Sequence, residues 1–238
     1  MLKQIFSLTG LLFAATTTTA AVAASANVVE LAARALGAGP AAEIKERIFK
    51  RPFTMHDAAY RREAFAALPA AIRDSRITEG KIARRTERVV RTVLELHSRR
   101  DAIELVLFHD DRPLGMLFRE SVLVLSRGLV AALEDSELAG IVAHELGHTY
   151  FIGELALAHG AQDLRGMKVV ELKCDAVAML TLQLLGNDPG DLISGLRKLE
   201  RVRERMLLSS HRNESHPNIV ARAQFAERFS KLLIARKG

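Results

Sequence analysis

The stretch His144-Glu145-Leu146-Gly147-His148 decides the fold class of this sequence, because it predicts both a helix and the chemistry that the helix carries. Residues four apart lie on the same face of an α-helix, so both histidine rings can reach one metal ion. Glu145, next to the first histidine, can then take a proton from a water on that ion. The pattern H-E-x-x-H also occurs by chance, so the residues around it must support it.

The flanking sequence predicts a helix at this place. The N-cap candidate is Ser136-Glu137, which follows Glu134-Asp135. The acidic residues of this stretch place negative charge in the first turn. Apolar residues then recur at positions 138, 141, 142 and 146, which is a helical spacing. Upstream, residues 121–126 are typical of a buried strand, and residues 128–133 of a helical turn after it.

A catalytic metal needs a third protein ligand and an open position, and Glu171 is the candidate for that ligand. Glu171 lies 27 residues after His144, on a second helix predicted from Met167 to Leu185 with Gly186 as its C-cap. Asp175, one turn later, can accept the free ring N–H of a ligand histidine. The alternative is that Glu171 and Asp175 are solvated charges, but most of this helix is apolar.

Cys174 lies between these two acidic residues and is itself a candidate ligand. Three protein ligands already fill a catalytic site, and position 174 projects roughly 60° away from Glu171 on a helix. We therefore expect Cys174 to be a small buried apolar residue.

Ser215-His216-Pro217 lies in a polar stretch that leads into the last predicted helix. Pro217 suits a first helical turn and holds His216 extended before it. A histidine fixed there can stabilise the oxyanion of a tetrahedral intermediate, and Arg222 is a second candidate for this role. The alternative role of His216 is to cap the loop.

With these three segments, the chain resembles the peptidase family of HtpX and the CAAX prenyl endopeptidases, in a compact, soluble periplasmic form. The resemblance implies a gluzincin-type site with one Zn²⁺ per chain, held by His144, His148 and Glu171, and with Glu145 as catalytic base. The family's E-x-x-x-D pattern matches Glu171 and Asp175. Its S/T-H-P…R pattern matches residues 215–217 and Arg222, and the resemblance covers roughly residues 101–230.

Two departures from the family pattern concern the cleft and the membrane. The family often has Asn-Ala-Phe on the strand before the active helix, where this chain has Gly115-Met-Leu-Phe118. That strand is the place where a substrate backbone would pair. The segment between His148 and Glu171 is also too short for the transmembrane pair of HtpX.

The first 26 residues are typical of a secretory signal peptide. Lys3 precedes an apolar run from Ile5 to Ala15, and small residues place the cleavage site after Ala23 or Ala26. An uncleaved membrane anchor is the alternative. No later segment approaches about 18 apolar residues, so we expect a mature protein without a membrane span, located in the periplasm.

The remaining sequence predicts an α+β, zincin-like fold. A mainly helical region at residues 27–100 precedes a metallopeptidase domain at residues 101–238. Three short apolar runs predict a sheet of about three strands, onto which the H-E-x-x-H helix packs. These runs are residues 102–108, 115–118 and 122–125.

Charge is unevenly distributed along the chain. Residues 43–100 hold 15 Lys and Arg against 8 Asp and Glu, whereas residues 101–200 hold 8 against 16. Solvated helix faces explain the basic region, and weak contact with anionic membrane surfaces is the alternative. The chain has no Trp and only two Tyr, and no basic strand with interleaved aromatic residues, so nucleic acid is not an expected partner.

Together these features predict a zinc-dependent endopeptidase that acts on protein or peptide substrates of the cell envelope. The alternative is a latent or inactive peptidase-like module that binds misfolded or outer-membrane proteins. In that case His216 closes the open position on the metal.

Overall fold

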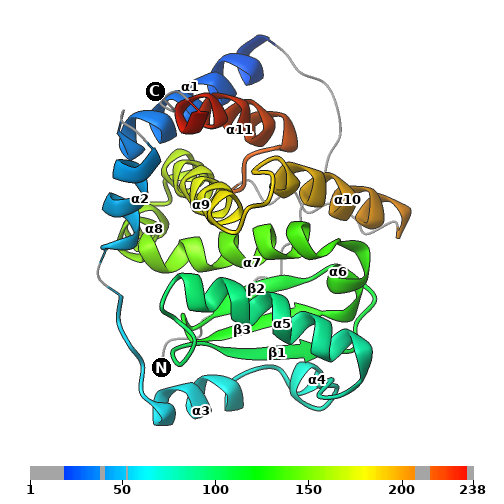
Figure 1. Ribbon diagram of the computed structural model, residues 1–238. Coiled ribbons are helices and arrows are strands. Elements are labelled where there is room, and N and C mark those ends of the chain that lie inside the picture. Colours follow the sequence, from blue (N-terminus) through cyan, green and yellow to red (C-terminus); the bar gives the residue numbers. More distant parts are fainter. Residues whose placement is uncertain (1–18, 38–40, 52, 207–214, 235–238) are drawn as a thin grey trace.

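The computed structural model describes residues 19–37, 41–51, 53–206 and 215–234 of the 238-residue chain (Figure 1). The elements in these ranges are, in chain order, α1 (Thr19–Leu36), α2 (Ala41–Phe49), α3 (Ala58–Ala66), α4 (Ala70–Arg73), α5 (Gly80–Leu96), β1 (Glu104–Phe108), β2 (Gly115–Phe118), β3 (Val122–Ser126), α6 (Arg127–Ala132), α7 (Asp135–Tyr150), α8 (Ile152–Gly160), α9 (Leu164–Leu184), α10 (Asp191–Arg205) and α11 (Ile219–Ile234). The helices greatly outnumber the strands.

The strands form one three-stranded sheet in the order β1-β3-β2, which confirms the predicted α+β class. β3 lies in the centre, parallel to β1 and antiparallel to β2. Every residue of β3 is buried, and all of them except the last, Ser126, are apolar. Because β3 is central, β2 is an edge strand. Its free edge faces the helix α7 rather than another strand of the described chain (Figure 1).

Alternate residues of β3 face two different cores, because side chains alternate across a strand. Leu123 and Leu125 belong to the main core, which also includes residues of α5, α7 and α9. Val122 and Val124 belong to a smaller cluster with residues of α3 and its neighbours. The sheet is thus covered by helices on both faces.

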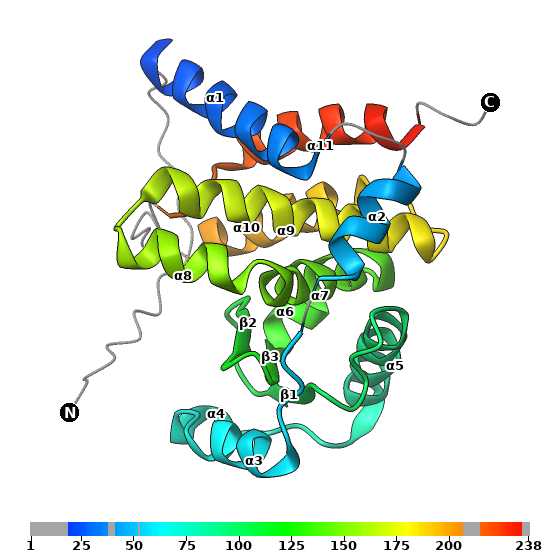
Figure 2. The ribbon, with the colours of Figure 1, turned by 90° about the vertical axis from the view of Figure 1, so that its left-hand side faces the viewer.

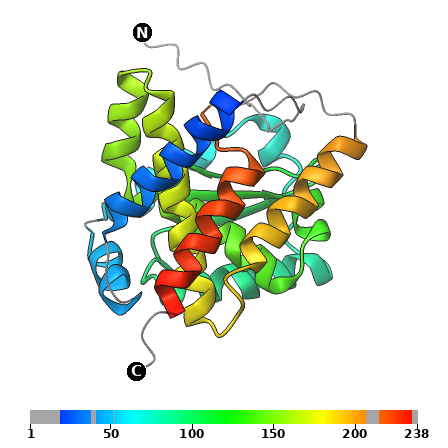
Figure 3. The same cartoon turned by 90° about the horizontal axis from the view of Figure 1, so that it is seen from above.

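The helices above the sheet are stacked in layers. Figure 2 shows α7 next to the sheet, α9 above it, and α1 and α11 at the top. α1 and α11 lie side by side across α9, as the view from above also shows (Figure 3). The long helix α9 therefore lies between α7 and α11, and it is buried along almost its whole length.

The ends of α7 and α9 differ from the prediction. The N-cap of α7 is Glu134 and not Ser136-Glu137: the Glu134 side chain and the Glu137 side chain cap each other's backbone N–H groups in a reciprocal capping box. α9 begins at Leu164, three residues before the predicted start at Met167, because Asp163 accepts N–H groups of its first turn. Its C-cap is Leu185, and Gly186 follows with a positive φ of 77°.

The predicted signal peptide lies largely outside the described residues, which begin at Thr19. The two predicted cleavage points, after Ala23 and Ala26, fall within the helix α1. Of the helices that the structure describes, none has a stretch that is both long and apolar enough to cross a membrane. The segment between α7 and α9, where HtpX has a transmembrane pair, is the short helix α8.

Candidate metal centre and active site

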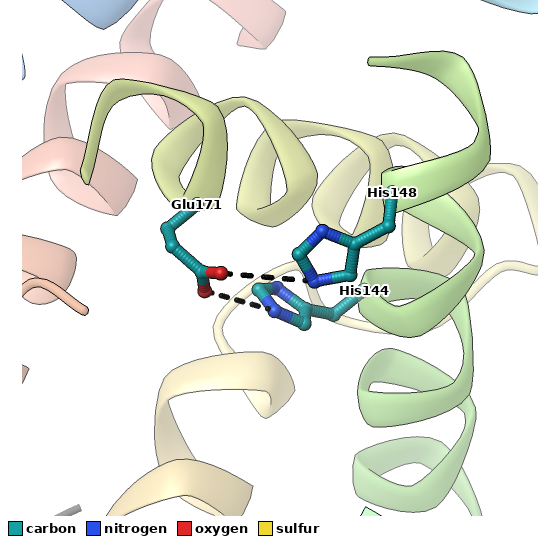
Figure 4. A group of neighbouring side chains, drawn as sticks. All are labelled: His144, His148 and Glu171. Atoms are coloured by element: carbon teal, nitrogen blue, oxygen red, sulfur yellow. Dashed lines mark ion pairs between the residues drawn. The ribbon is translucent and has the colours of Figure 1, made fainter. Parts of the chain in front are cut away.

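His144 and His148 of α7 and Glu171 of α9 point toward one another across the interface of the two helices (Figure 4). The distance from His144 Nε2 to Glu171 Oε2 is 3.4 Å, and the distance from His148 Nε2 to Glu171 Oε1 is 3.7 Å. One ligand atom from each residue lies within 4.8 Å of the other two. These three residues, here called the triad, form a set that can hold one metal ion.

Gly147 is required for the close approach of α7 and α9 that brings the triad together. A Cβ atom at this position would lie 2.8 Å from the Cα of Cys174 and 3.1 Å from its Sγ. Because the Cα belongs to the backbone of α9, the overlap could be relieved only by moving the two helices apart. The glycine inside the H-E-x-x-H pattern therefore sets the distance between the histidines and Glu171.

Replacing Gly147 by alanine is expected to destabilise the protein by about 1–3 kcal/mol, the usual cost of overpacking a core. Gly153 on α8 is the matched control, because a Cβ there meets nothing within 4 Å and alanine favours a helix. Thermal unfolding followed by circular dichroism measures both variants. A Gly147→Ala melting temperature equal to that of Gly153→Ala would show that the helices do not need this close contact.

Asp175 and Arg222 lie behind His144, on the side away from Glu171. His144 Nδ1 lies 2.8 Å from Asp175 Oδ1, so its Nε2 is left to face the triad. Arg222 of α11 donates to both carboxylate oxygens of Asp175, with a distance of 2.9 Å from Nε to Oδ2. Both side chains are buried, and the ion pair compensates for the loss of their hydration.

The site strongly favours positive charge on His144. Burial by itself would lower the pKa of this histidine, but its contacts with Asp175 and Glu171 outweigh burial and raise the pKa to about 9. Burial likewise would raise the pKa of Glu171, but His216, His144 and His148 bring it far below its usual range. Surroundings that hold a proton this firmly between histidine and carboxylate also favour a divalent cation.

Glu171 has a buried oxygen that the protein itself does not satisfy. Its Oε2 accepts no hydrogen bond, although Glu171 is only 4% exposed, and its ion-pair partner His144 Nε2 lies 3.4 Å away. A buried carboxylate oxygen that accepts no hydrogen bond is costly unless a cation occupies the space before it. This oxygen therefore supports the assignment of the triad as a metal site.

Cys174 lies behind His148, just as Asp175 lies behind His144. Its Sγ lies 3.6 Å from His148 Nδ1, so the sulfur can act as a weak acceptor for the ring N–H. Burial and the nearby carboxylates raise the pKa of the thiol well above its usual value. The residue is fully buried, as the sequence predicts for a small apolar residue, but its contact with His148 was not predicted.

Glu145 lies one residue after His144 and is half-buried beside the edge strand. Its Oε2 accepts a hydrogen bond of 3.2 Å from the backbone N–H of Leu117 in β2. Glu145 is therefore held between the helix α7 and the edge of the sheet, where the Leu117 N–H points away from β3.

His216 is brought to the triad, although it is 45 residues beyond Glu171. Its Nε2 lies 3.4 Å from Glu171 Oε1, and its Nδ1 lies 3.1 Å from the hydroxyl of Ser215. Burial lowers the pKa of His216, and the Glu171 carboxylate only partly opposes this. A neutral ring whose Nδ1 accepts the Ser215 hydroxyl carries its proton on Nε2, the nitrogen that faces the triad.

Comparison with protein families agrees with this geometry. The sequence model of peptidase family M48 matches residues 77–151, about a third of the chain. This match supports a metallopeptidase of family M48. A comparison with curated proteins found no match. The M48 match includes β1 to β3 and both histidines of the triad but ends before Glu171 and His216, so the place of these two residues in the site rests on the sequence motifs and on the structure.

A cavity of about 170 Å³ opens beside the M48 segment, next to His144, Glu145 and His216. Its other walls come from β2, α6, α10 and α11. None of the described residues that line it comes from the N-terminal helices α1 to α5.

The sequence did not predict that α10 lines the active site. Five residues of α10 face the cavity, but their spacing is that of any amphipathic helix, and no motif distinguishes them. The steric role of Gly147 could have been suspected from the sequence, since a glycine inside a helix that is not needed for packing costs stability. The role of α10 depends on tertiary packing and had no such signal.

Proposed function

We propose that the protein is a zinc-dependent endopeptidase that cleaves protein or peptide substrates of the cell envelope. The observation that carries this proposal is the buried triad with Glu145 beside it, on elements that include the segment matched by peptidase family M48. The activity is of the same kind as the one that the sequence pattern predicts.

Zinc fits the residues of the triad. Two imidazole nitrogens and one carboxylate are a common ligand set of catalytic zinc, which keeps a further position open. Bonds of about 2.1 Å at tetrahedral angles place neighbouring ligand atoms roughly 3.4 Å apart. The distances of 3.4 and 3.7 Å from the two histidine nitrogens to Glu171 agree with this spacing.

When bound, zinc would lower the pKa of a water molecule to about 7 and polarise the carbonyl of the peptide bond. Glu145 would accept the proton of the attacking water on a carboxylate oxygen and deliver it to the leaving nitrogen. His216 would donate its Nε2–H to the oxyanion of the tetrahedral intermediate. Asp175 holds the His144 ring in the orientation that directs Nε2 to the triad, and Arg222 holds Asp175.

The edge strand β2 supplies a place for the substrate backbone. Within a strand, the N–H and C=O of one residue point to the same side, and Leu117 directs its N–H away from β3 toward Glu145. Gly115, two residues earlier, presents its backbone to the same edge. An extended peptide that pairs with this edge would lie beside Glu145, and this pairing needs no particular side chain on the substrate.

The periplasm is the proposed location, and envelope proteins are the proposed substrates. The support comes from the sequence of residues 1–26, with a basic residue, an apolar run and small residues before Ala23 and Ala26. A membrane-anchored form remains the alternative if this segment is retained.

One observation favours a second candidate function, a latent peptidase that binds misfolded or outer-membrane proteins. His216 Nε2 lies 3.4 Å from a ligand oxygen of the triad, close enough for the ring to occupy the open position of a metal. The two candidates give opposite expectations for the His216→Ala variant. Cleavage falls if His216 stabilises the oxyanion, and it rises if His216 blocks the metal.

The test is cleavage of a diverse peptide mixture by the purified protein, with products identified by mass spectrometry. We expect cleavage with added zinc, loss of cleavage with a zinc chelator, and recovery when zinc is restored. The His216→Ala variant is measured in parallel. Cleavage that persists in the chelator would exclude the metal mechanism, and absence of cleavage by both proteins would exclude endopeptidase activity.

A further inference from the structure

The cavity beside the triad is bounded by one face of α10. The residues of α10 that line it recur three or four apart, and they are Leu196, Leu199, Glu200, Arg203 and Glu204. The first two are apolar and the other three are charged. The wall therefore changes from apolar to charged along the helix. Such a wall suits a side chain that has an apolar stem and a charged end.

α10 is fixed over the cavity at several points. Ser194 and Lys198 donate to the two carboxylate oxygens of Glu137 in α7, each at 2.7 Å. Further along, Arg203 Nη2 donates to the carbonyl oxygen of Pro113, ahead of β2, at 3.0 Å. Because α10 is bound both to α7 and to the start of the edge strand, its charged residues have a defined position relative to the triad.

The charges on this wall are not balanced. Arg203 is bound to Pro113, whereas neither Glu200 nor Glu204 has a hydrogen bond or ion pair within the described ranges of the chain. Burial and the neighbouring Glu204 raise the pKa of Glu200, and Arg197 and Arg201, which do not line the cavity, offset this only in part. Glu200 is thus a partly buried carboxylate that forms no ion pair with the arginines near it in the part of the chain that the structure describes.

We propose that this cavity binds a lysine or arginine side chain of the substrate next to the cleaved bond, and that Glu200 selects it. The inference rests on the proposed peptidase function. The aliphatic part of the side chain would pack on Leu196 and Leu199, and its charged end would reach Glu200.

The size of the cavity agrees with a single side chain. Its volume of about 170 Å³ is below the roughly 300–1,000 Å³ of sites that hold a whole small-molecule ligand. Since His144 and Glu145 form another wall of the same cavity, a side chain in it belongs to a residue beside the reacting peptide bond. The cavity is therefore a determinant of where the chain is cut.

The test uses short alanine-rich peptides that contain a single lysine or, instead, a single norleucine, which has a similar aliphatic chain without the ammonium group. Binding of fluorescently labelled peptides is measured by anisotropy, with the full chain carrying Glu145→Gln and loaded with zinc. We expect the lysine peptide to bind roughly fivefold more tightly, the size of a partly exposed ion pair. The added substitution Glu200→Gln should remove this difference.

Glu87→Gln is the matched control, because Glu87 is an exposed carboxylate on α5 that does not line the cavity. It should leave the lysine preference unchanged. Equal binding of the two peptides would overturn the proposed subsite, and so would a preference that survives Glu200→Gln or disappears in Glu87→Gln.

Cleavage of the same peptides by the parent protein separates this inference from the proposed function. Cleavage without a lysine preference contradicts only the subsite. A lysine preference that depends on Glu200, with no cleavage by the parent protein, supports the subsite and contradicts the endopeptidase activity.

Discussion

Glu145→Gln is expected to reduce peptide cleavage by roughly 10²–10⁴-fold, the usual contribution of a general base, while the metal stays bound. Glutamine has nearly the same shape, and its amide oxygen can still accept the Leu117 N–H that holds Glu145 in place. Only the ability to accept a proton from water is lost. Glu145 is not a member of the triad, so the ligands of the metal are unchanged.

Two measurements are needed to interpret this variant. Initial cleavage rates on one defined peptide give the loss of activity, and elemental analysis of the dialysed protein gives the metal content. Cleavage at the rate of the parent would contradict the assignment of Glu145 as the base. Loss of metal together with activity would instead show that Glu145 contributes to metal binding.

Glu171→Gln is expected to weaken zinc binding by more than about 100-fold. The substitution removes the only carboxylate of the triad and leaves a neutral amide, which is a poor zinc ligand, in a buried position. Asp175→Asn gives a scale for this effect, because loss of a residue behind a ligand lowers metal affinity by about 10–100-fold. A larger loss of zinc affinity in Glu171→Gln than in Asp175→Asn would show that Glu171 binds the metal directly and that Asp175 acts by positioning His144.

Competition with a coloured zinc chelator measures both affinities, and thermal unfolding shows whether each variant is folded. Asp175→Asn leaves Arg222 buried with a weaker partner, so its stability must be measured before its affinity is interpreted. An affinity of Glu171→Gln equal to that of the parent would remove Glu171 from the set of ligands, whatever the effect of Asp175→Asn.

The local parts of the fold could be predicted from the sequence. The sequence pattern of the H-E-x-x-H segment predicts a helix, and the folded chain has the helix α7 there. The three apolar runs predict three strands, which is the number in the sheet. Element ends were less accurate. Glu134, and not Ser136-Glu137, caps α7, because the capping box with Glu137 satisfies two backbone N–H groups at once.

The candidate site could be predicted only as far as its motifs extend. The structure brings Glu171, Asp175, His216 and Arg222 together with the histidines, although they come from three separate segments. The strand order β1-β3-β2 and the position of α10 could not be predicted, because both depend on which surfaces pack against each other. Glu200 consequently had no sign of importance in the sequence.

The pairing of Asp175 with Arg222 has a consequence for the order in which the chain folds. Arg222 follows Asp175 by 47 residues and lies on the last described helix. Until α11 has been synthesised and has docked, Asp175 has only His144 as a partner and lacks the hydrogen bonds from Arg222, and a buried ion pair that misses one partner is strongly destabilising. The centre is therefore completed late, and a nascent chain that already contains H-E-x-x-H does not yet hold a finished, potentially destructive hydrolytic site.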